Sequence, residues 1–455
     1  MRLTGARCIG LVAAAALAAA ATAAGAGSTP TASYTCTGSA VVDEANLQPL
    51  IDAGGSITLH GPAACAGNYS ASSVTLALTG ADAGATMDGG GTGSVLIADD
   101  AVVTLSDLTL THGNGSGVDD PGDPSGANGG GVSATDSTLT IDHCRLVDNH
   151  AGEQGGAIHA AESEVTVADS TLVSNTSVEG GGGIDTDEDV DLTVIGSTIS
   201  GNTTGPHGGG IEAFDGSLVL AASTVSGNAV TGTTDFRSGG GIWAGLADVS
   251  ITSSTIRNNS STEFGGGIGY SGGPGMTLSV TGSTVYGNLA ADGGGGIRND
   301  AYYGDAPLVV DHSTIVGNRA GQGGGIDAYG LHGYTSSVTL TSSRIAGNVA
   351  RNGLGGGIDS FVDPSGGATL VSVASTTIGP RPGALNDGNR AWWGGGIAAN
   401  GAYGTASVVL HPGAVLVGNA AAFNGGGVFK RNGATLVTEP GALLALNRPN
   451  NVGSG

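Results

Sequence analysis

The sequence predicts an all-β solenoid, a parallel β-helix built from stacked coils, on three observations. A glycine-rich signal that ends in a small or aliphatic apolar residue recurs at intervals of 26 to 39 residues. A second signal, an aliphatic residue followed by two residues and Asn, recurs between its copies. Short stretches with alternating apolar residues separate the two signals. Self-similarity at such a period is typical of stacked repeat architectures.

The glycine-rich signal is best represented by the letters GGGI, and its glycines let the backbones of neighbouring coils approach closely at a corner. Each copy ends in one aliphatic residue that we expect to point into the core. These residues are Val132, Ile158, Ile184, Ile211, Ile242, Ile268, Ile297, Ile326, Ile358, Ile397 and Val428.

The Asn signal predicts a second corner. The residue before each Asn is mostly Gly, Asn or Asp, the types that tolerate a positive φ, with Ser174 and Leu446 as exceptions. Asn at the same turn of successive coils can form a ladder of amide hydrogen bonds. The ladder residues are Asn149, Asn175, Asn202, Asn228, Asn259, Asn288, Asn318, Asn348, Asn389, Asn419 and Asn447.

The stretches between the signals predict about three short strands per coil. Residues 210–213, 217–221 and 223–226 show the pattern: each stretch is too short for a helix and alternates with period two. In the third stretch the alternation places a Ser inward. Cys144 falls in this Ser column, so we expect it to be a buried, reduced thiol that acts as a small core residue.

The two ends of the chain differ from the repeats. Residues 1–26 have the basic start, apolar run and small residues of a signal peptide, and the run is too short to span a membrane. Residues 27–128 are expected to form an N-terminal cap and the first coils, with a short helix over 43–52 covering the open end of the solenoid. Regular coils occupy 129–450, and 451–455 form a C-terminal tail. After export, Cys36 and Cys65 are expected to form a disulfide bond.

The charge of the chain limits its partners. The formal net charge is −24, and removal of the signal peptide with Arg2 and Arg7 makes it more negative. Such a surface repels nucleic acid and anionic lipid, and an anionic polysaccharide would need Ca²⁺ or a local Arg cluster as intermediary. We expect a monomer that is secreted or associated with a cell surface, without a membrane span.

The paired signals resemble the GGA[ILV] and FxxN repeats of polymorphic outer membrane proteins, within the pectin-lyase-like superfamily. The resemblance covers about Ala127 to Asn450 and implies a right-handed parallel β-helix. That superfamily mixes polysaccharide lyases, hydrolases, adhesins and scaffolds, so the resemblance leaves the activity open. The chain has Ile or Val where the membrane proteins have Phe, and we expect it to lack their barrel. It also lacks the NTD, GHG and RIK signatures of polygalacturonases.

Candidate ligand-binding residues lie in the loops that lengthen along the chain. The distance from GGGI to the aliphatic residue of the third strand is 14 or 15 residues in the early coils and 17 to 20 in the coils from Ile268 to Ile397. The longer loops carry Tyr302, Tyr303, Tyr329 and Tyr334. Exposed Tyr rings offer flat surfaces for sugar rings, although the same rings can also simply pack the loops against one another.

Candidate catalytic residues follow GGGI by one position, in a column that alternation places outward. Arg298, Asp327 and Asp359 occupy consecutive coils there and should lie within one or two strand spacings of each other. Two carboxylates with an Arg suit a lyase or an acid/base hydrolysis. Alternatively, they form a surface ladder in which Arg298 only relieves repulsion.

Candidate metal ligands lie nearer the N-terminus. Asp185, Asp187 and Asp189 belong to an acidic loop that could bind Ca²⁺ through oxygen ligands, or could be ordinary solvated charge. No other cofactor is predicted. Two functions therefore remain: a scaffold or adhesin-like protein that binds a glycan or another surface through its long loops, and a polysaccharide lyase or glycoside hydrolase.

Overall fold

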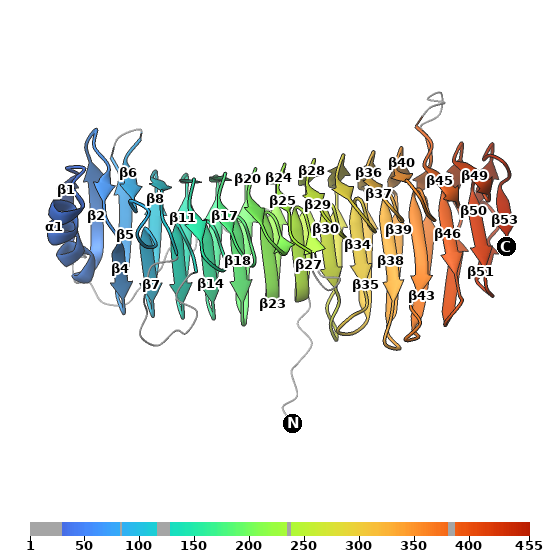
Figure 1. Ribbon diagram of the computed structural model, residues 1–455, viewed down its shortest axis with the longest axis horizontal. Coiled ribbons are helices and arrows are strands. Elements are labelled where there is room, and N and C mark those ends of the chain that lie inside the picture. The colour runs from blue at the N-terminus through green and yellow to red at the C-terminus, as the bar shows by residue number, and fades with distance from the viewer. Residues whose placement is uncertain (1–29, 82–83, 116–127, 234–237, 381–386) are drawn as a thin grey trace.

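The structure, a computed structural model, describes residues 30–81, 84–115, 128–233, 238–380 and 387–455. The predicted signal peptide lies outside these residues. The described residues form a rod in which successive coils stack in chain order from one end to the other (Figure 1). Within them, no helix combines the length and apolar character needed to cross a membrane. The prediction of an all-β parallel solenoid is confirmed.

One coil illustrates the repeat. It consists of β14 (Ile158–Ala161), β15 (Glu164–Ala168), β16 (Thr171–Val173) and β17 (Thr176–Ser177). The first two strands belong to a 27-stranded sheet, the third to a 14-stranded sheet and the fourth to a 10-stranded sheet. Each strand pairs in parallel with its equivalent in the next coil. Each coil of this kind has four strands, whereas the sequence predicted three; the additional one is the two-residue strand after the Asn turn.

The N-terminal end of the solenoid is covered by α1 (Ala40–Asp52), as the sequence predicts (Figure 1). Leu47 and Ile51 on this helix are buried against the first coils. The carboxylate of Asp43 accepts hydrogen bonds from Tyr34 Oη at 2.7 Å and from the backbone N–H of Ala66 at 3.0 Å. The structure also joins Cys36 to Cys65 by a disulfide bond, which ties the cap to the first coil.

The C-terminal residues are part of the last coil, whereas the sequence suggested a tail. Strand β53 (Val452–Ser454) pairs in parallel with β50 (Val428–Arg431). The reason is the amide ladder, because Asn451 Oδ1 accepts a hydrogen bond from Asn447 Nδ2 at 3.1 Å and so extends the ladder by one step.

The amide ladder runs through the second corner as predicted. Asn202 is fully buried; its backbone N–H and its Nδ2 donate to Asn228 Oδ1 in the next coil at 2.9 and 3.0 Å. Except at Gly388, the turn residue before the ladder Asn adopts a positive φ, even at Ser174 (58°) and Leu446 (57°). The ladder therefore overrides the conformational preference of these side chains.

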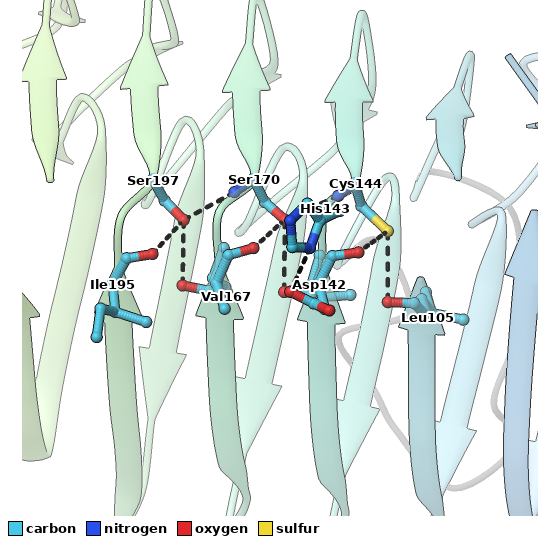
Figure 2. Close-up of polar contacts among 10 residues, drawn as sticks. Leu105, Asp142, His143, Cys144, Val167, Ser170, Ile195 and Ser197 are labelled. Carbon is cyan, nitrogen blue, oxygen red and sulfur yellow. Dashed lines mark hydrogen bonds and ion pairs between the residues drawn. The ribbon is translucent and has the colours of Figure 1, made fainter. Parts of the chain in front are cut away.

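Cys144 occupies the inward Ser column. The backbone N–H of Cys144 donates to Ser170 Oγ at 2.9 Å, and Ser170 N–H donates to Ser197 Oγ at 3.0 Å, so the three residues form one ladder (Figure 2). The thiol points to the carbonyl oxygens of Leu105 and Asp142 at 3.4 and 3.3 Å. The prediction of a buried free thiol is confirmed.

Burial raises the pKa of the Cys144 thiol to about 11, so the thiol is protonated at neutral pH. We expect no reaction with Ellman's reagent in the folded protein and full reaction after unfolding, because the thiolate is the reactive form. The C144S variant should change the free energy of unfolding by no more than about 1 kcal/mol, since Ser fills the same column elsewhere. Rapid labelling of the folded protein would contradict this assignment.

Candidate functional site

The described residues line a partly open pocket of about 650 Å³ against the 27-stranded sheet in the C-terminal half. The three predicted catalytic residues, Arg298, Asp327 and Asp359, all line it. Its volume lies in the range of small-ligand sites. Aromatic side chains and polar side chains complete the lining: Phe264, Tyr329, Phe361 and Trp393, together with Asp292, Gln322, Asn352 and Arg431.

The strand register brings the three predicted residues together. Arg298 on β34 (Ile297–Asp300) pairs with Asp327 on β38 (Ile326–Gly330), which pairs with Asp359 on β42 (Ile358–Val362). Their exposed fractions are only 3%, 3% and 1%. The three side chains are therefore not exposed, because other residues of the chain cover this face of the sheet. That Arg298 relieves repulsion between the carboxylates stays a prediction, and its ion pair with Asp327 agrees with it.

The side chains that cover Arg298, Asp327 and Asp359 come from a column of residues, one per coil, each of which immediately precedes a glycine triplet. Phe264, Gln322, Leu354 and Trp393 all hold this position, and all four line the pocket. Gly293 holds it in the coil of Arg298, where a Cβ atom would lie 2.2 Å from Asp327 Oδ2. A side chain at 293 would thus displace the Asp327 carboxylate. Sequence reasoning missed this column, although its fixed place before the triplet identifies it.

Arg298 is held from several sides. Its Nη1 donates to Asp327 Oδ2 at 2.5 Å, and its Nε lies 3.5 Å from Asp300 Oδ2. The guanidinium carbon lies over the rings of Phe264 and Tyr329, at 4.7 and 4.0 Å from their centroids. Burial raises the pKa of Asp300 to about 6 despite this cation. Arg298 is therefore the positive charge that lies against the buried carboxylates of Asp327 and Asp300.

Asp359 differs from Asp327 in its surroundings. It accepts a hydrogen bond from the backbone N–H of Ser360 at 3.1 Å. Burial, followed by the negative charge of Asp327, raises the pKa of Asp359 well above its usual value. The pocket thus contains a carboxylate that is ion-paired with Arg298 and a neighbouring carboxyl group that binds a proton more readily.

Of the four predicted Tyr residues, Tyr329 lines the pocket. Its ring stacks on Phe361 with centroids 5.4 Å apart, and its hydroxyl donates to Asp363 Oδ2 at 2.5 Å. Tyr302 and Tyr303 instead contact each other edge to face, with centroids 4.9 Å apart. Tyr334 is exposed and does not line the pocket. The structure therefore brings only one of the four to the site.

A second group of titratable residues lies in the same two columns nearer the N-terminus. His159 Nδ1 is 3.1 Å from Asp185 Oδ2, and His207 Nδ1 is 3.0 Å from Glu212 Oε1. Asp185 and Glu212 are both buried. Burial, then the neighbouring acids, raises the pKa of Glu212 to about 8 and the pKa values of Asp185 and Asp187 to about 6.

The predicted calcium ligands do not converge. Asp185 is buried beside His159, Asp187 is half-buried, and Asp189 is exposed. The reason is a turn at Glu188 and Asp189, both with φ 56°, which separates Asp189 from the strand. A different group of side chains in the described residues has the spacing of metal ligands. Asp142, His143 and Asp169 place one potential ligand atom each within 4.8 Å of one another, and the group is largely exposed.

Because the pKa of the Glu212 carboxyl group is raised, we expect the free energy of unfolding to fall as the pH rises. Its pKa in the folded chain is about 8, above the ordinary 4.5, so the folded chain holds a proton that the unfolded chain releases between these values. The free energy of unfolding should fall across this interval, by at most about 1.4 kcal/mol per pH unit for this group. Asp185 and Asp187, whose pKa values are also raised, lie close to Glu212, and His207 Nδ1 lies 3.0 Å from Glu212 Oε1.

The E212Q variant has no proton to lose, so we expect a shallower fall of the unfolding free energy between pH 5 and 8. Urea unfolding at a series of pH values measures the slope. E164Q, which changes an exposed glutamate on β15 two coils away, is the matched control and should keep the wild-type slope. Equal slopes for wild type and E212Q would show that Glu212 is not the group responsible.

The fold and the pocket define a β-helix protein with a ligand-sized site on one face of the solenoid. The chain belongs to the family described as "Right handed beta helix region", whose model matches residues 84–246, 130–302 and 183–378. No curated protein matches the chain. A similar solved structure is the periplasmic alginate epimerase AlgG, with 13% identity over 70% of this chain and 70% of that chain and a TM-score of 0.40.

Proposed function

We propose that this chain is an exported β-helix protein that binds a glycan in the pocket around Arg298, Asp327 and Asp359. The observation that carries the proposal is the lining itself. Aromatic rings with flat apolar faces stand beside carboxylates, amides and a guanidinium in one volume of about 650 Å³. Sugars need both kinds of contact, because their rings have apolar faces and their hydroxyl groups form hydrogen bonds.

Export is supported by the signal-like residues 1–26 and by the Cys36–Cys65 disulfide bond, since such bonds persist in oxidising compartments. The strongly acidic chain favours neutral or cationic glycans. Arg431 is a local exception to this negative charge. It lines the pocket, and it forms no ion pair with another described residue. An acidic sugar would therefore bind at Arg431 or through Ca²⁺.

A second candidate is a glycan-cleaving enzyme, and one observation favours it. Asp327 and Asp359 are register partners, one ion-paired with Arg298 and the other with a raised pKa. Glycoside hydrolysis uses two carboxyl groups in these different states. Asp359 would give its proton to the glycosidic oxygen, and Asp327 would act on water or on the anomeric carbon.

The experiment is a panel of neutral and acidic polysaccharides with and without added Ca²⁺. Binding is followed by affinity electrophoresis, and cleavage by new reducing ends or by unsaturated products. Binding without cleavage supports the scaffold function. New reducing ends that disappear in D359N support hydrolysis, and unsaturated products that require Ca²⁺ support a lyase. The absence of both binding and cleavage across the panel would overturn the proposal.

A further inference from the structure

Three aromatic side chains form an exposed cluster beside the pocket, and we call Trp392, Trp393 and Phe423 the aromatic platform. The centroid of Phe423 lies 6.1 Å from that of Trp392 and 5.0 Å from that of Trp393. The two Trp rings are 5.9 Å apart. Phe423 is 61% exposed and Trp392 is 42% exposed. Large apolar groups at such exposure are costly to leave in water, so their clustering indicates a binding surface.

The platform depends on an irregularity of the backbone. Strand β45 (Arg390–Trp393) pairs with β49 (Ala420–Asn424), and the register shifts between Ala391 and Trp393. Neighbouring residues of a regular strand point to opposite faces, which would separate the two Trp rings. A bulge redirects a side chain and is common beside functional sites. Here both indoles contact the same Phe423 ring.

The platform is continuous with the pocket. Trp393 lines the pocket together with Asn352 and Leu354, and it also contacts Phe423. The coil of Phe423 lies two coils beyond that of Asp359, because Asp359 pairs with Ala398 and Ala398 with Phe429. At about 4.8 Å per coil, this is roughly 10 Å along the solenoid axis. A ligand that contacts both must be longer than one sugar ring.

We propose that the aromatic platform is a second sugar-binding subsite, and that the ligand is an oligosaccharide or polysaccharide lying along the solenoid axis from the pocket toward the C-terminus. This inference rests on the proposed glycan-binding function. Sugar rings can stack on Phe423 and Trp392 through their apolar faces, while Asn352 and Gln322 at the pocket rim offer hydrogen bonds to hydroxyl groups. The acidic chain disfavours an anionic lipid surface as the occupant.

The test compares chain lengths. The probes are cellohexaose, xylohexaose, laminarihexaose and maltohexaose, each with the disaccharide of its series, titrated by isothermal calorimetry. The variant is W392A/F423A, which removes two exposed rings and leaves Trp393 in the pocket wall. Y403A is the matched control, because Tyr403 is 54% exposed and belongs to neither the pocket nor the platform.

We expect the variant to bind its hexasaccharide roughly tenfold more weakly than wild type does, with the affinity for the disaccharide unchanged or too low to measure in both. Y403A should keep the wild-type affinity. An unchanged hexasaccharide affinity overturns the platform subsite and leaves the pocket function standing. An equal loss for both lengths also overturns it, because the pocket itself was then disturbed.

Two further outcomes separate the remaining alternatives. If wild type binds none of the sugars, both this inference and the glycan-binding function are overturned for these glycan classes. If the variant changes the sedimentation of the protein from dimer to monomer and keeps its sugar affinity, the platform is a contact between two copies of the chain and not a subsite.

Discussion

The N202A variant should lose about 3 to 5 kcal/mol of unfolding free energy. Asn202 Oδ1 accepts hydrogen bonds from the backbone N–H and the Nδ2 of Asn175 at 2.9 and 3.0 Å, and Asn202 Nδ2 donates to the carbonyl of Leu172 at 3.1 Å. Alanine leaves the N–H of Asn175 and the carbonyl of Leu172 buried without these partners. Each buried group left unsatisfied costs about 1 to 3 kcal/mol. Urea unfolding measures the total.

The loss should be local before it is global, because each coil of a solenoid contacts only its neighbours. Hydrogen exchange is therefore expected to accelerate first at the Asn175 amide. S200A is the control: Ser200 is the half-buried last residue of β20 (Thr198–Ser200), just before the turn, and its removal should cost less than about 0.5 kcal/mol. Similar losses for the two variants would contradict a stabilising role of the amide ladder.

Replacing Arg298 by Met should lower the free energy of unfolding by about 3 to 5 kcal/mol at pH 7. Met keeps much of the packing against Phe264 and Tyr329 but leaves Asp327 and Asp300 buried without their cation. Removing one partner of a buried ion pair strands an uncompensated charge. Because protonation neutralises stranded carboxylates, we expect the penalty to shrink as the pH falls from 7 to 5.

Two variants make this test specific. R319M replaces an exposed arginine farther along the same coil, on β37 (Arg319–Ala320), and should be nearly neutral at both pH values. D327N added to R298M should recover part of the loss, because it removes one stranded charge. A penalty for R298M that is the same at pH 5 and pH 7 would show that lost packing, rather than stranded charge, is its cause.

The fold could be predicted from the sequence because its determinants recur at every coil. The aliphatic residue of GGGI, the Asn of the second corner and the inward Ser each mark one position in each repeat, and Cys144 could be placed from the Ser column alone. The C-terminal strand β53 escaped prediction, because Asn451 extends the ladder outside the usual spacing.

The site could be predicted only in part. Alternation along β34, β38 and β42 puts Arg298, Asp327 and Asp359 on one face, and the structure places them in one pocket. Alternation cannot tell whether another segment covers that face. Phe264 precedes its glycine triplet outside any strand, and Trp393 ends β45 where the register shifts, so strand alternation does not give the direction of either side chain.

The tyrosines of the long loops show a second limit of prediction from the sequence. Loop length and composition indicated aromatic side chains on one side of the solenoid, but not their direction. Tyr329 is still on strand β38, so its ring is directed to Arg298, whereas Tyr302 and Tyr303 follow the end of β34 and pack on each other. Position relative to the strand end decides which Tyr reaches the pocket.

The most direct test of the glycan-binding pocket is to fill it without removing any buried group. Asn352 is exposed at the pocket rim, so N352W should block the volume and preserve Arg298, Asp327 and Asp359. On a glycan array, N352A should bind the same class of glycan as wild type but more weakly, because it loses one hydrogen-bonding group, and N352W should lose that binding entirely while retaining the wild-type circular dichroism spectrum. Undiminished binding by N352W, or no glycan binding by wild type, would contradict the account.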